Sequence, residues 1–519
     1  MQVHVFGARC IGIEALRVTV EIEITHGVGI HLVGLADAAV KESLLRTTTA
    51  LQALQFRIPG KKIVINLAPA DLHKSGSGYD LPIAVGIIAA SEQKALPLVG
   101  RYLLMGELGL DGSVRPVPGA LPIAERARND GFEGVILPRT SAAEARVFAE
   151  ELNIFGVSRL SDVLRILGGE EDCSDLLVQH QAPPGEDPPA GSGLMDFSEI
   201  VGQDAAKRGI EIAVSGNHNI MMVGPPGSGK SSLARAITGI LPPMDAEEAL
   251  LTSKIYSIAG KGIPGGTAYR RPFRAPHYSI SLPALLGGGS GDNIQPGEVS
   301  LSHGGVLFLD EFVQMPKMVM EALRGPLEDR KVVISRLRSK LEYPASFLLV
   351  AAANPCPCGY YGEGDRCSCT PAQRRNYLAR LSGPILDRID LQLLVRSLPA
   401  AELVDASRSG KGRESSAEVA ARVAAARKIQ RRRFAGTGIY TNAEMSSRQM
   451  QRYCPLSSAC RDTLSRITER LGLSARAFTR VIKLARTIAD LAGAAEIEPA
   501  HLVEAAAYRF LDRSDLYDL

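Results

Sequence analysis

The chain has 519 residues, which at roughly 100–200 residues per domain predicts about three domains. Its 59 Lys and Arg residues against 56 Asp and Glu residues give a net charge of +3, so any nucleic-acid binding must come from local clusters of cations. Hydrophobic residues make up 45% of the chain, which is ordinary for folded domains and excludes disorder throughout.

Membrane and secretion signals are weak. The first residues, MQVHVFGARC, do not place a charged segment before an apolar run, as a secretory signal does. The best candidate for a membrane span, residues 81–90, is about half the required length and predicts a buried helix. The eight cysteines are sparse, which disfavours a disulfide scaffold. We therefore expect a cytoplasmic protein with no membrane partner.

Residues 1–168 are predicted to form an α/β domain. Residues 18–24 (VTVEIEI) and 62–66 (KIVIN) alternate in polarity as strands do, whereas residues 37–53 and 141–151 have helical periodicity.

A linker and a second α/β block follow. Residues 169–193 are rich in Pro, Gly and acidic residues and are predicted to be a flexible linker. In the block 194–395, residues 220–223, 306–309 and 347–351 are apolar, as is typical of short strands in a parallel sheet covered by helices.

Residues 396–519 change character. A polar stretch, SRSGKGRESS, leads into Ala- and Arg-rich segments, which predict an all-helical domain. One of its helices is strongly basic; such a run usually marks a solvated face, and contact with DNA phosphates is the second hypothesis. The cations of this helix are Arg422, Arg427, Lys428, Arg431, Arg432 and Arg433.

A phosphate-binding loop lies between a predicted strand and a predicted helix. The segment GPPGSGKS matches the pattern G-x-x-x-x-G-K-[ST] in full, and the flanking strand and helix disfavour a chance match in a Gly-rich turn. Glycines let successive backbone N–H groups face phosphates. Lys230 is expected to reach the β- and γ-phosphates, and Ser231 to bind Mg²⁺. The predicted loop residues are Gly224, Pro225, Pro226, Gly227, Ser228, Gly229, Lys230, Ser231 and Ser232.

Two carboxylates and an amide follow the next apolar strands. In VLFLDE, Asp310 is expected to hold Mg²⁺ through water and Glu311 to polarise the attacking water. A strand that simply ends in solvated acids is the alternative, which the upstream phosphate loop disfavours. Asn354 ends the strand FLLVAAAN and is expected to lie beside Asp310. These residues predict hydrolysis of ATP with Mg²⁺.

Two arginines could supply further positive charge. Arg388 lies in LSGPILDRID and Arg476 in LSARAFTR. A γ-phosphate needs more positive charge than one lysine provides, and an arginine can come from a neighbouring subunit. A surface salt bridge is the alternative for each, and spacing does not decide between them.

Four cysteines lie within fourteen positions and could enclose a tetrahedral Zn²⁺. Disulfides are disfavoured in the cytoplasm, and thiols buried for packing do not cluster in this way. We therefore predict a structural zinc site that braces the loop after Asn354. Its ligands would be Cys356, Cys358, Cys367 and Cys369.

The motifs together resemble a known family. IVGQ, the phosphate loop, LFLDE, AAANP and ILDRID follow the order seen in AAA+ ATPases. RRPFRAPHYSIS, PGEVSLSHGGVLFLDE, ALRGPLEDRKVVISR and AAANPCPCGYYG more closely resemble the magnesium-chelatase-like YifB/ComM family. The resemblance covers essentially the whole chain. It implies a Lon-protease-like N-terminal α/β domain, a P-loop AAA+ ATPase core with a parallel sheet, and an all-helical C-terminal lid.

The resemblance also implies roles and partners. Gly202 and Gln203 would lie near the adenine, Asn354 would be sensor 1, Arg388 the arginine finger that reaches the neighbour's ATP, and Arg476 sensor 2. It implies a bacterial homohexameric ring. Members act as DNA helicases that promote branch migration on single-stranded or branched DNA in natural transformation, a setting that implies recombination proteins as partners.

Two segments are candidates for contact with DNA. A hairpin is predicted over residues 331–345 with a basic tip, and residues 259–302 interleave basic and aromatic residues, a pattern suited to phosphate contact and base stacking. A solvated charged loop is the alternative for the second segment. The predicted DNA contacts are Arg336, Arg338, Lys340, Arg270, Arg271 and Arg274.

Proteolysis is not expected. HKSGSGYDLPIAVGII and GELGLDGSVRPVPGALPIA resemble the Lon peptidase domain, which uses a serine activated by a lysine. In the resemblance, Asp80 stands at the serine position and Pro122 at the lysine position, and neither can do that chemistry. A shift of a few residues would instead bring in Ser77 or Lys74. A chelatase motor and a protein-remodelling ATPase remain alternatives to the DNA motor, which the basic hairpin tip favours.

Overall fold

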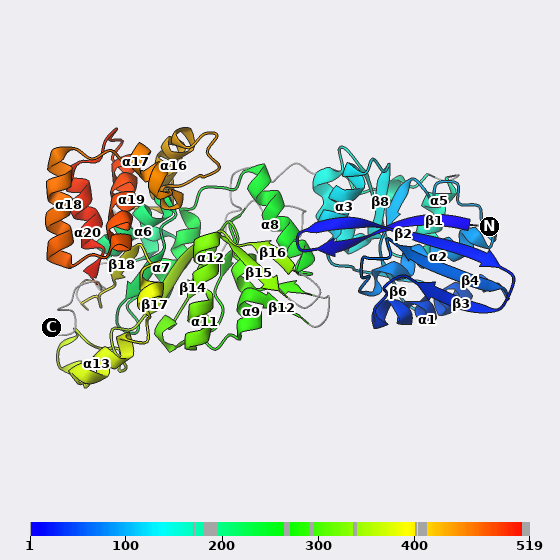
Figure 1. Ribbon diagram of the computed structural model, residues 1–519, viewed down its shortest axis with the longest axis horizontal. Coiled ribbons are helices and arrows are strands. Elements are labelled where there is room, and N and C mark those ends of the chain that lie inside the picture. Colours follow the sequence, from blue (N-terminus) through cyan, green and yellow to red (C-terminus); the bar gives the residue numbers. More distant parts are fainter. Residues whose placement is uncertain are drawn as a thin grey trace.

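The computed structural model describes residues 2–169, 172–180, 195–263, 270–289, 294–335, 340–399, 402 and 413–510. The N-terminal domain forms one lobe, and the second α/β block and the C-terminal helices together form the other (Figure 1). In the described part of the chain, none of the helices combines the length and the hydropathy needed to cross a bilayer.

The N-terminal domain is a seven-stranded sheet covered by helices. Alternation of polarity explains its hairpin, because Val18, Val20 and Ile22 of the second strand are fully buried. In spatial order the strands are β3 (Gly29–Val33), β4 (Lys62–Ala68), β2 (Glu14–Thr25), β1 (Gln2–Ile11), β5 (Tyr102–Leu104), β8 (Gly134–Pro138) and β9 (Asn153–Val157). A separate pair joins β6 (Glu107–Leu108) to β7 (Val114–Arg115). The helices are α1 (Ala38–Ala53), α2 (Asp80–Ala90), α3 (Ala120–Asn129), α4 (Arg139–Ala142) and α5 (Leu160–Gly168).

Most elements predicted for this domain are confirmed. Asp37 caps α1 by accepting the backbone N–H of Val40 at 2.8 Å, and the apolar helix α2 is buried along nearly all its length. Residues 141–151 do not form one helix, since α4 passes into the 3₁₀ segment η2 (Ala143–Phe148). Here Ser141 bonds to the backbone of Val117 at 3.1 Å, a tertiary contact that sequence periodicity does not reveal.

Part of the predicted linker packs on this domain. Residues 172–180 contain the 3₁₀ segment η3 (Ser174–Leu176), Leu176 is buried in the domain core, and Leu177 forms a bridge with Phe155 of β9. Gly169 ends α5, and the rest of the expected linker, residues 170–171 and 181–193, lies outside the described residues.

The second α/β block is built on a five-stranded parallel sheet. The strands predicted at residues 220–223 and 306–309 are confirmed to the residue, and the third begins one residue later than predicted. In spatial order they are β11 (Phe273–Arg274), β14 (Val306–Leu309), β17 (Leu348–Ala353), β10 (Ile220–Val223) and β18 (Leu391–Leu394). Because all the pairings are parallel, the carboxyl ends of β10, β14 and β17 meet at one edge.

Helices pack on both faces of this sheet, and two separate strand pairs lie in the same block. The predicted hairpin is confirmed as β15 (Lys331–Ser335) paired with β16 (Lys340–Pro344). A further pair joins β12 (Gly287–Gly288) to β13 (Gln295–Pro296). The helices of this block are α6 (Asp204–Gly216), α7 (Lys230–Ala236), α8 (Ala246–Ile258), α9 (Leu282–Leu286), α10 (Glu298–Leu301), α11 (Lys317–Ala322), α12 (Arg324–Asp329), α13 (Pro371–Leu378) and α14 (Gly383–Leu386).

Over residues 413–510 the regular structure is helical, as predicted. These helices share one hydrophobic core with a face of the parallel sheet, where Val481 and Ile488 pack in the same cluster as Ile220 and Val350. The helical part is therefore fixed to the core by burial as well as by the chain. Its helices are α16 (Ser416–Arg433), α17 (Ser447–Tyr453), α18 (Ser458–Leu471), α19 (Ala475–Leu491) and α20 (Pro499–Ala507).

The basic helix α16 uses several of its cations inside the protein. Arg422 pairs with Glu211 at 2.5 Å, and Arg427 donates to the Val214 carbonyl at 2.7 Å. Arg433 pairs with a buried aspartate of α19. These guanidiniums hold α16 to its neighbours, which weakens the hypothesis that the helix is a face for DNA.

The two lobes meet where α8 lies beside α3 (Figure 1). Lys254 of α8 donates to Glu125 at 2.6 Å, and the Ser257 hydroxyl donates to Glu144 at 2.6 Å. The backbone N–H of Gly119 donates to the Ser257 carbonyl at 2.9 Å. Burial raises the pKa of Glu144, opposed by the bond from Ser257. The N-terminal domain is therefore docked on the core by specific contacts.

Candidate functional site

The phosphate loop connects β10 to α7, as the sequence predicts. Gly227 and Gly229 have φ values of 77° and 94°, a left-handed conformation that glycine adopts without strain. A Cβ atom at Gly224 would clash with the carbonyl oxygen of Val395. These glycines are thus required by the turn itself.

Lys230 lies across this loop and is 8% exposed. Its ammonium donates to the carbonyls of Gly224 at 2.7 Å and Pro225 at 2.8 Å, and to Oδ1 of Asn354 at 3.3 Å. Burial lowers the pKa of Lys230, an effect opposed by nearby Asp310 and Glu311. The strand order brings Asn354 to this lysine, because β17 lies directly beside β10.

Ser231 and Asp310 meet at the same edge. The Ser231 hydroxyl donates to Oδ2 of Asp310 at 3.0 Å, and Oδ1 of Asp310 accepts the backbone N–H of Glu311 at 2.9 Å. Glu311 has a φ of 49°, a strained conformation for a residue with a side chain and one that clusters at functional sites. The buried hydroxyl oxygen of Ser228 has no hydrogen-bond partner.

This set of groups fits ATP and Mg²⁺. Hydroxyl and carboxylate oxygens are the ligands that Mg²⁺ prefers, and Ser231 and Asp310 present both within 3.0 Å of each other. The lysine, the loop N–H groups and the unpartnered Ser228 hydroxyl are donors suited to phosphate oxygens.

Gly202 and Gln203 lie beside the loop. The Gln203 side chain donates to the Ser228 carbonyl at 3.4 Å and to the Arg396 carbonyl at 2.6 Å. Gln203 also lines a cavity of about 680 Å³ whose wall includes Leu398. A Cβ at Gly202 would come within 3.0 Å of Leu398, so glycine suits that position. Gln203 therefore connects this cavity to the phosphate loop through the Ser228 carbonyl.

Arg388 lies at the opposite edge of the sheet from the loop. It precedes β18, which pairs with β10 in the parallel register Ile220↔Leu391, whereas the loop follows Val223. At about 3.3 Å per residue the four-residue strand alone separates the two by roughly 10 Å. The Arg388 guanidinium instead pairs with Glu328, whose pKa it lowers, and donates to the Pro384 carbonyl at 2.8 Å.

Arg476 lies near Arg388 and far from the loop of its own chain. Its side chain is 61% exposed and contacts Asp387, the residue before Arg388, at 3.4 Å. Arg476 also contributes to the lowered pKa of Glu328. The structure therefore brings the two arginines together and separates both from Lys230.

The four cysteines of the predicted zinc site come together. Their sulfurs all lie within 4.8 Å of one another. The distances from Cys367 to Cys356 and Cys358 are 3.8 and 3.7 Å, close to the separation of about 3.8 Å that a tetrahedral site with Zn–S bonds of about 2.3 Å requires. In the same loop a Cβ at Gly359 would lie 2.8 Å from Pro226, so this loop packs on the phosphate loop.

Tyr377 of α13 is a site neighbour that the sequence analysis missed. The backbone N–H of Asn354 bonds to its hydroxyl, and burial, with Cys356 and Glu311 close by, raises the pKa of Tyr377 to about 12. Tyr377 lies in a polar segment without a recognisable motif, so the sequence gives no signal for it. The fold of the cysteine loop is what places it beside Asn354.

The predicted DNA contacts divide into three groups. Arg336 and Arg338 lie outside the described residues, and Lys340 is 68% exposed at the start of β16. Arg271 and Arg274 are engaged inside the protein. Arg271 pairs with Glu248 at 2.8 Å, and Arg274 pairs with Glu298 at 2.6 Å. Arg270 is exposed.

The residues of the predicted Lon-like pattern are engaged in structural contacts. Asp80 is fully buried and pairs with Arg46 at 2.8 Å, and Pro122 is buried in α3. The Ser77 hydroxyl donates to Glu107, and the fully buried Lys74 donates to the carbonyl of Pro69. In these contacts neither Ser77 nor Lys74 is the other's partner.

Three family models match the chain. They are "Magnesium chelatase, subunit ChlI" over residues 196–403, "Subunit ChlI of Mg-chelatase" over residues 20–141, and "Magnesium chelatase, subunit ChlI C-terminal" over residues 413–509.

Curated relatives cover nearly the whole chain. YifB of Salmonella typhimurium, described as uncharacterized, is 42% identical over 97% of this chain and 96% of its own length. Competence protein ComM of Haemophilus influenzae is 41% identical over 98% and 97%. The magnesium-chelatase 67 kDa subunit of Chlorobaculum parvum is 27% identical over 31% of this chain and 24% of its own. The chain thus belongs to the YifB/ComM family of magnesium-chelatase-like AAA+ ATPases.

Proposed function

We propose that this chain is the subunit of a homohexameric ring that hydrolyses ATP with Mg²⁺ and moves on single-stranded or branched DNA. Its task would be branch migration during homologous recombination in natural transformation. The observation that carries the ring is the separation of Arg388 from the phosphate loop of its own chain by the length of β18. A complete site then needs two subunits.

One half of the proposed site comes from the carboxyl edge of the sheet. Lys230 and the loop N–H groups would bind the β- and γ-phosphates, and Ser231 and Asp310 would hold Mg²⁺, which neutralises phosphate charge when bound. Glu311 would orient and deprotonate the attacking water, and Asn354 would hold that water in place.

The other half would come from a neighbouring subunit. Arg388, which is 8% exposed, lies close to the exposed Arg476, and both would have to leave a carboxylate partner, Glu328 or Asp387, to reach a phosphate. Such an exchange of partners is favourable only when a γ-phosphate of higher charge is present. This gives each subunit a way to respond to the nucleotide of its neighbour.

The DNA part of the proposal has two supports. The first is the relative named competence protein ComM, which is similar over almost the whole chain. The second is the sequence between β15 and β16, which contains Arg336 and Arg338, together with Lys340, which is exposed at the start of β16. Cations at the pore of a ring would bind phosphates without reading sequence, as a translocating motor requires.

The test is the ATPase rate with and without single-stranded and branched DNA, at two salt concentrations. Strong stimulation that falls with salt is expected for the DNA motor. The double variant Arg338→Ala, Lys340→Ala should keep the basal rate and lose stimulation, whereas Lys317→Ala, an exposed lysine of α11, should keep both. If rings whose assembly has been confirmed show no stimulation by DNA, the hypothesis of a DNA motor is refuted.

A chelatase-type motor is the second candidate. It is favoured by the chelatase family models and by the relative named magnesium-chelatase 67 kDa subunit. The full-length match with YifB and ComM, against 31% coverage by that subunit, favours the first candidate. An ATPase that ignores DNA would direct the search to porphyrin-pathway partners or to protein substrates.

We also propose a structural Zn²⁺ in the cysteine cluster and no protease activity in the N-terminal domain. The sulfur geometry and the packing of Gly359 on Pro226 support a metal that braces the phosphate loop. Elemental analysis should find one zinc for each chain, and Cys356→Ser should lose it.

The absence of protease activity is supported by the buried Asp80–Arg46 pair, which gives the residue at the serine position a structural role. A protease assay with casein as the substrate should therefore show no cleavage after prolonged incubation.

A further inference from the structure

A buried carboxylate fixes the segment that carries Arg388. Asp390, two residues later, is 4% exposed; its Oδ2 accepts the backbone N–H of Asn219 at 2.9 Å and lies 3.7 Å from Nδ1 of His218. Its Oδ1 accepts from Arg480 of α19. Although burial opposes it, Arg480 and His218 hold the pKa of Asp390 well below its usual range. Asp390 therefore ties the start of β18 to the helical domain.

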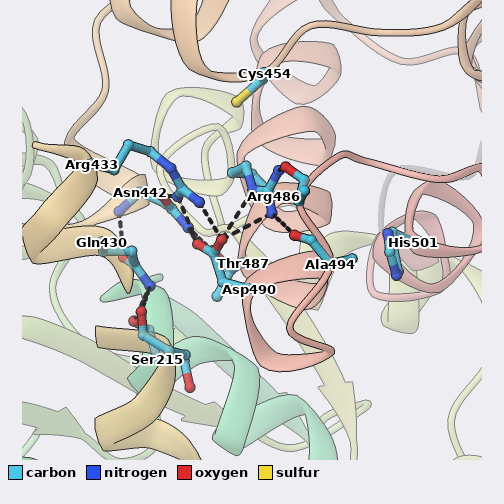
Figure 2. A network of polar contacts seen from close by, with 12 residues as sticks. Ser215, Gln430, Arg433, Asn442, Cys454, Arg486, Thr487, Asp490, Ala494 and His501 are labelled. Atoms are coloured by element: carbon cyan, nitrogen blue, oxygen red, sulfur yellow. Dashed lines mark hydrogen bonds and ion pairs between the residues drawn. The ribbon is translucent and has the colours of Figure 1, made fainter. Parts of the chain in front are cut away.

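The helix that supplies Arg480 is itself fixed by a second buried carboxylate, Asp490 (Figure 2). Asp490 is 2% exposed and accepts from Arg433 of α16, from Arg486 at 3.1 Å and from the Asn442 side chain at 2.8 Å. Two guanidiniums and an amide on one carboxylate hold α16, α19 and the segment between them in one arrangement.

Two links connect this cluster to the core. The Gln430 side chain accepts the backbone N–H of Asn442 and donates to the Ser215 carbonyl of α6, both at 2.9 Å (Figure 2). The Asn442 amide also donates to the Thr487 hydroxyl at 3.0 Å, and that hydroxyl lies 2.8 Å from Nε2 of His218. A continuous set of buried contacts thus runs from Asp490 to Asp390.

Thr487, His218 and Asp390 have the chemical order of a hydrolytic triad, but they cannot serve as one. Thr487 and His218 are fully buried, and Asp390 nearly so, which leaves no access for a substrate. Their role is to connect elements.

We propose that Asp390 and Arg480 are positioning residues, which hold Arg388 in place by tying its segment to the helical domain. The helical domain of one subunit would in this way control ATP hydrolysis at its neighbour's site. The inference rests on the proposed ring, in which Arg388 acts on that site. Misplacement of a reacting group by about 1 Å costs roughly 100-fold in rate.

The experiment mixes full-length subunits that have complementary defects. Arg480→Met removes the link from α19, and Lys230→Ala removes the subunit's own phosphate site but leaves its arginines in place. Alone, the Arg480→Met ring should lose roughly 100-fold in kcat while KM and ATP affinity stay unchanged. Mixing the two should restore hydrolysis, because Lys230→Ala subunits present correctly placed arginines to intact phosphate sites.

Three further variants make the result specific. Arg388→Ala mixed with Lys230→Ala tests the ring itself and should also recover. Arg422→Met breaks a different ion pair between the helical domain and α6, with Glu211 at 2.5 Å, and should keep wild-type kcat. Asp390→Asn keeps the shape of the buried side chain and should behave as Arg480→Met does. Arg480→Lys should regain part of the rate.

The outcomes separate the two proposals. If Arg388→Ala recovers on mixing and neither Arg480→Met nor Asp390→Asn does, the positioning role is wrong and the ring stands. Wild-type kcat in Arg480→Met would also overturn it. If Arg388→Ala itself does not recover, the shared site is wrong, and the inference fails with it.

Discussion

Removal of the Asp490 carboxylate should loosen the helical domain selectively. In Asp490→Ala, Arg486 keeps the carbonyls of Ala494 and Ala495, whereas Arg433 keeps Asn442 at 3.0 Å but loses its carboxylate partner. Breaking a buried ion pair by removing one partner costs about 3–5 kcal/mol, because the remaining charge stays buried without compensation. The Arg486 side chain is 2% exposed, so water offers it little relief.

Hydrogen exchange followed by mass spectrometry measures this cost locally, which suits a chain of several domains. Peptides from α16 and α19 should lose protection by at least about 100-fold, the equivalent of about 3 kcal/mol, while N-terminal peptides keep theirs. Arg431→Ala is the control, since its pair with Asp245 spans 3.8 Å between side chains 55% and 48% exposed and should cost under about 1 kcal/mol. Exchange of α19 within tenfold of the wild type would refute the reasoning.

Three further outcomes follow from single side chains. Lys230→Ala should abolish ATP binding measured by calorimetry, and retained affinity would remove Lys230 from the phosphate site. Glu311→Gln should bind ATP normally and hydrolyse it about 10²–10⁴-fold more slowly in a single-turnover assay; an unchanged rate would contradict its role as base. His303 follows α10 and its Nδ1 accepts the backbone N–H of Ser346 at 3.1 Å. Burial lowers the pKa of His303 to about 4, so the stability that the neutral ring contributes is complete above roughly pH 6.5 and falls by about 3 kcal/mol as the pH drops toward 4. His303→Gln should flatten that slope in urea titrations, and an unchanged slope would count against it.

The meeting of the phosphate-loop residues with Asp310 and Asn354 could be predicted because these residues follow strands. Lys230, Asp310 and Asn354 each come directly after an apolar run or its loop, and parallel strands end at one edge. Backbone pattern and motif therefore agree, and the contacts of Lys230 with Asn354 and of Ser231 with Asp310 follow.

The partners of the basic residues could not be predicted from the sequence. In the sequence, Arg271, Arg274 and Arg427 resemble cations that bind a polyanion. In the structure each is engaged by a group elsewhere in the chain, such as Glu248 or Glu298. A guanidinium gains as much from a buried carboxylate or carbonyl as from a phosphate, so charge density alone does not distinguish the two.

The place of Arg388 shows what strand order adds to sequence spacing. Spacing put Arg388 after the core without saying which phosphate it serves. The parallel register of β18 with β10 places Arg388 at the edge of the sheet opposite the phosphate loop, so in the proposed ring one chain would hold two half-sites and no complete one. ATP hydrolysis should then depend on protein concentration, falling when dilution dissociates the ring, whereas ATP binding through Lys230 should persist. Rate for each chain measured across a dilution series, beside sedimentation of the same samples, tests this. If dissociated subunits hydrolyse ATP at the same rate for each chain, Arg388 and Arg476 serve another purpose and the site is complete within one chain.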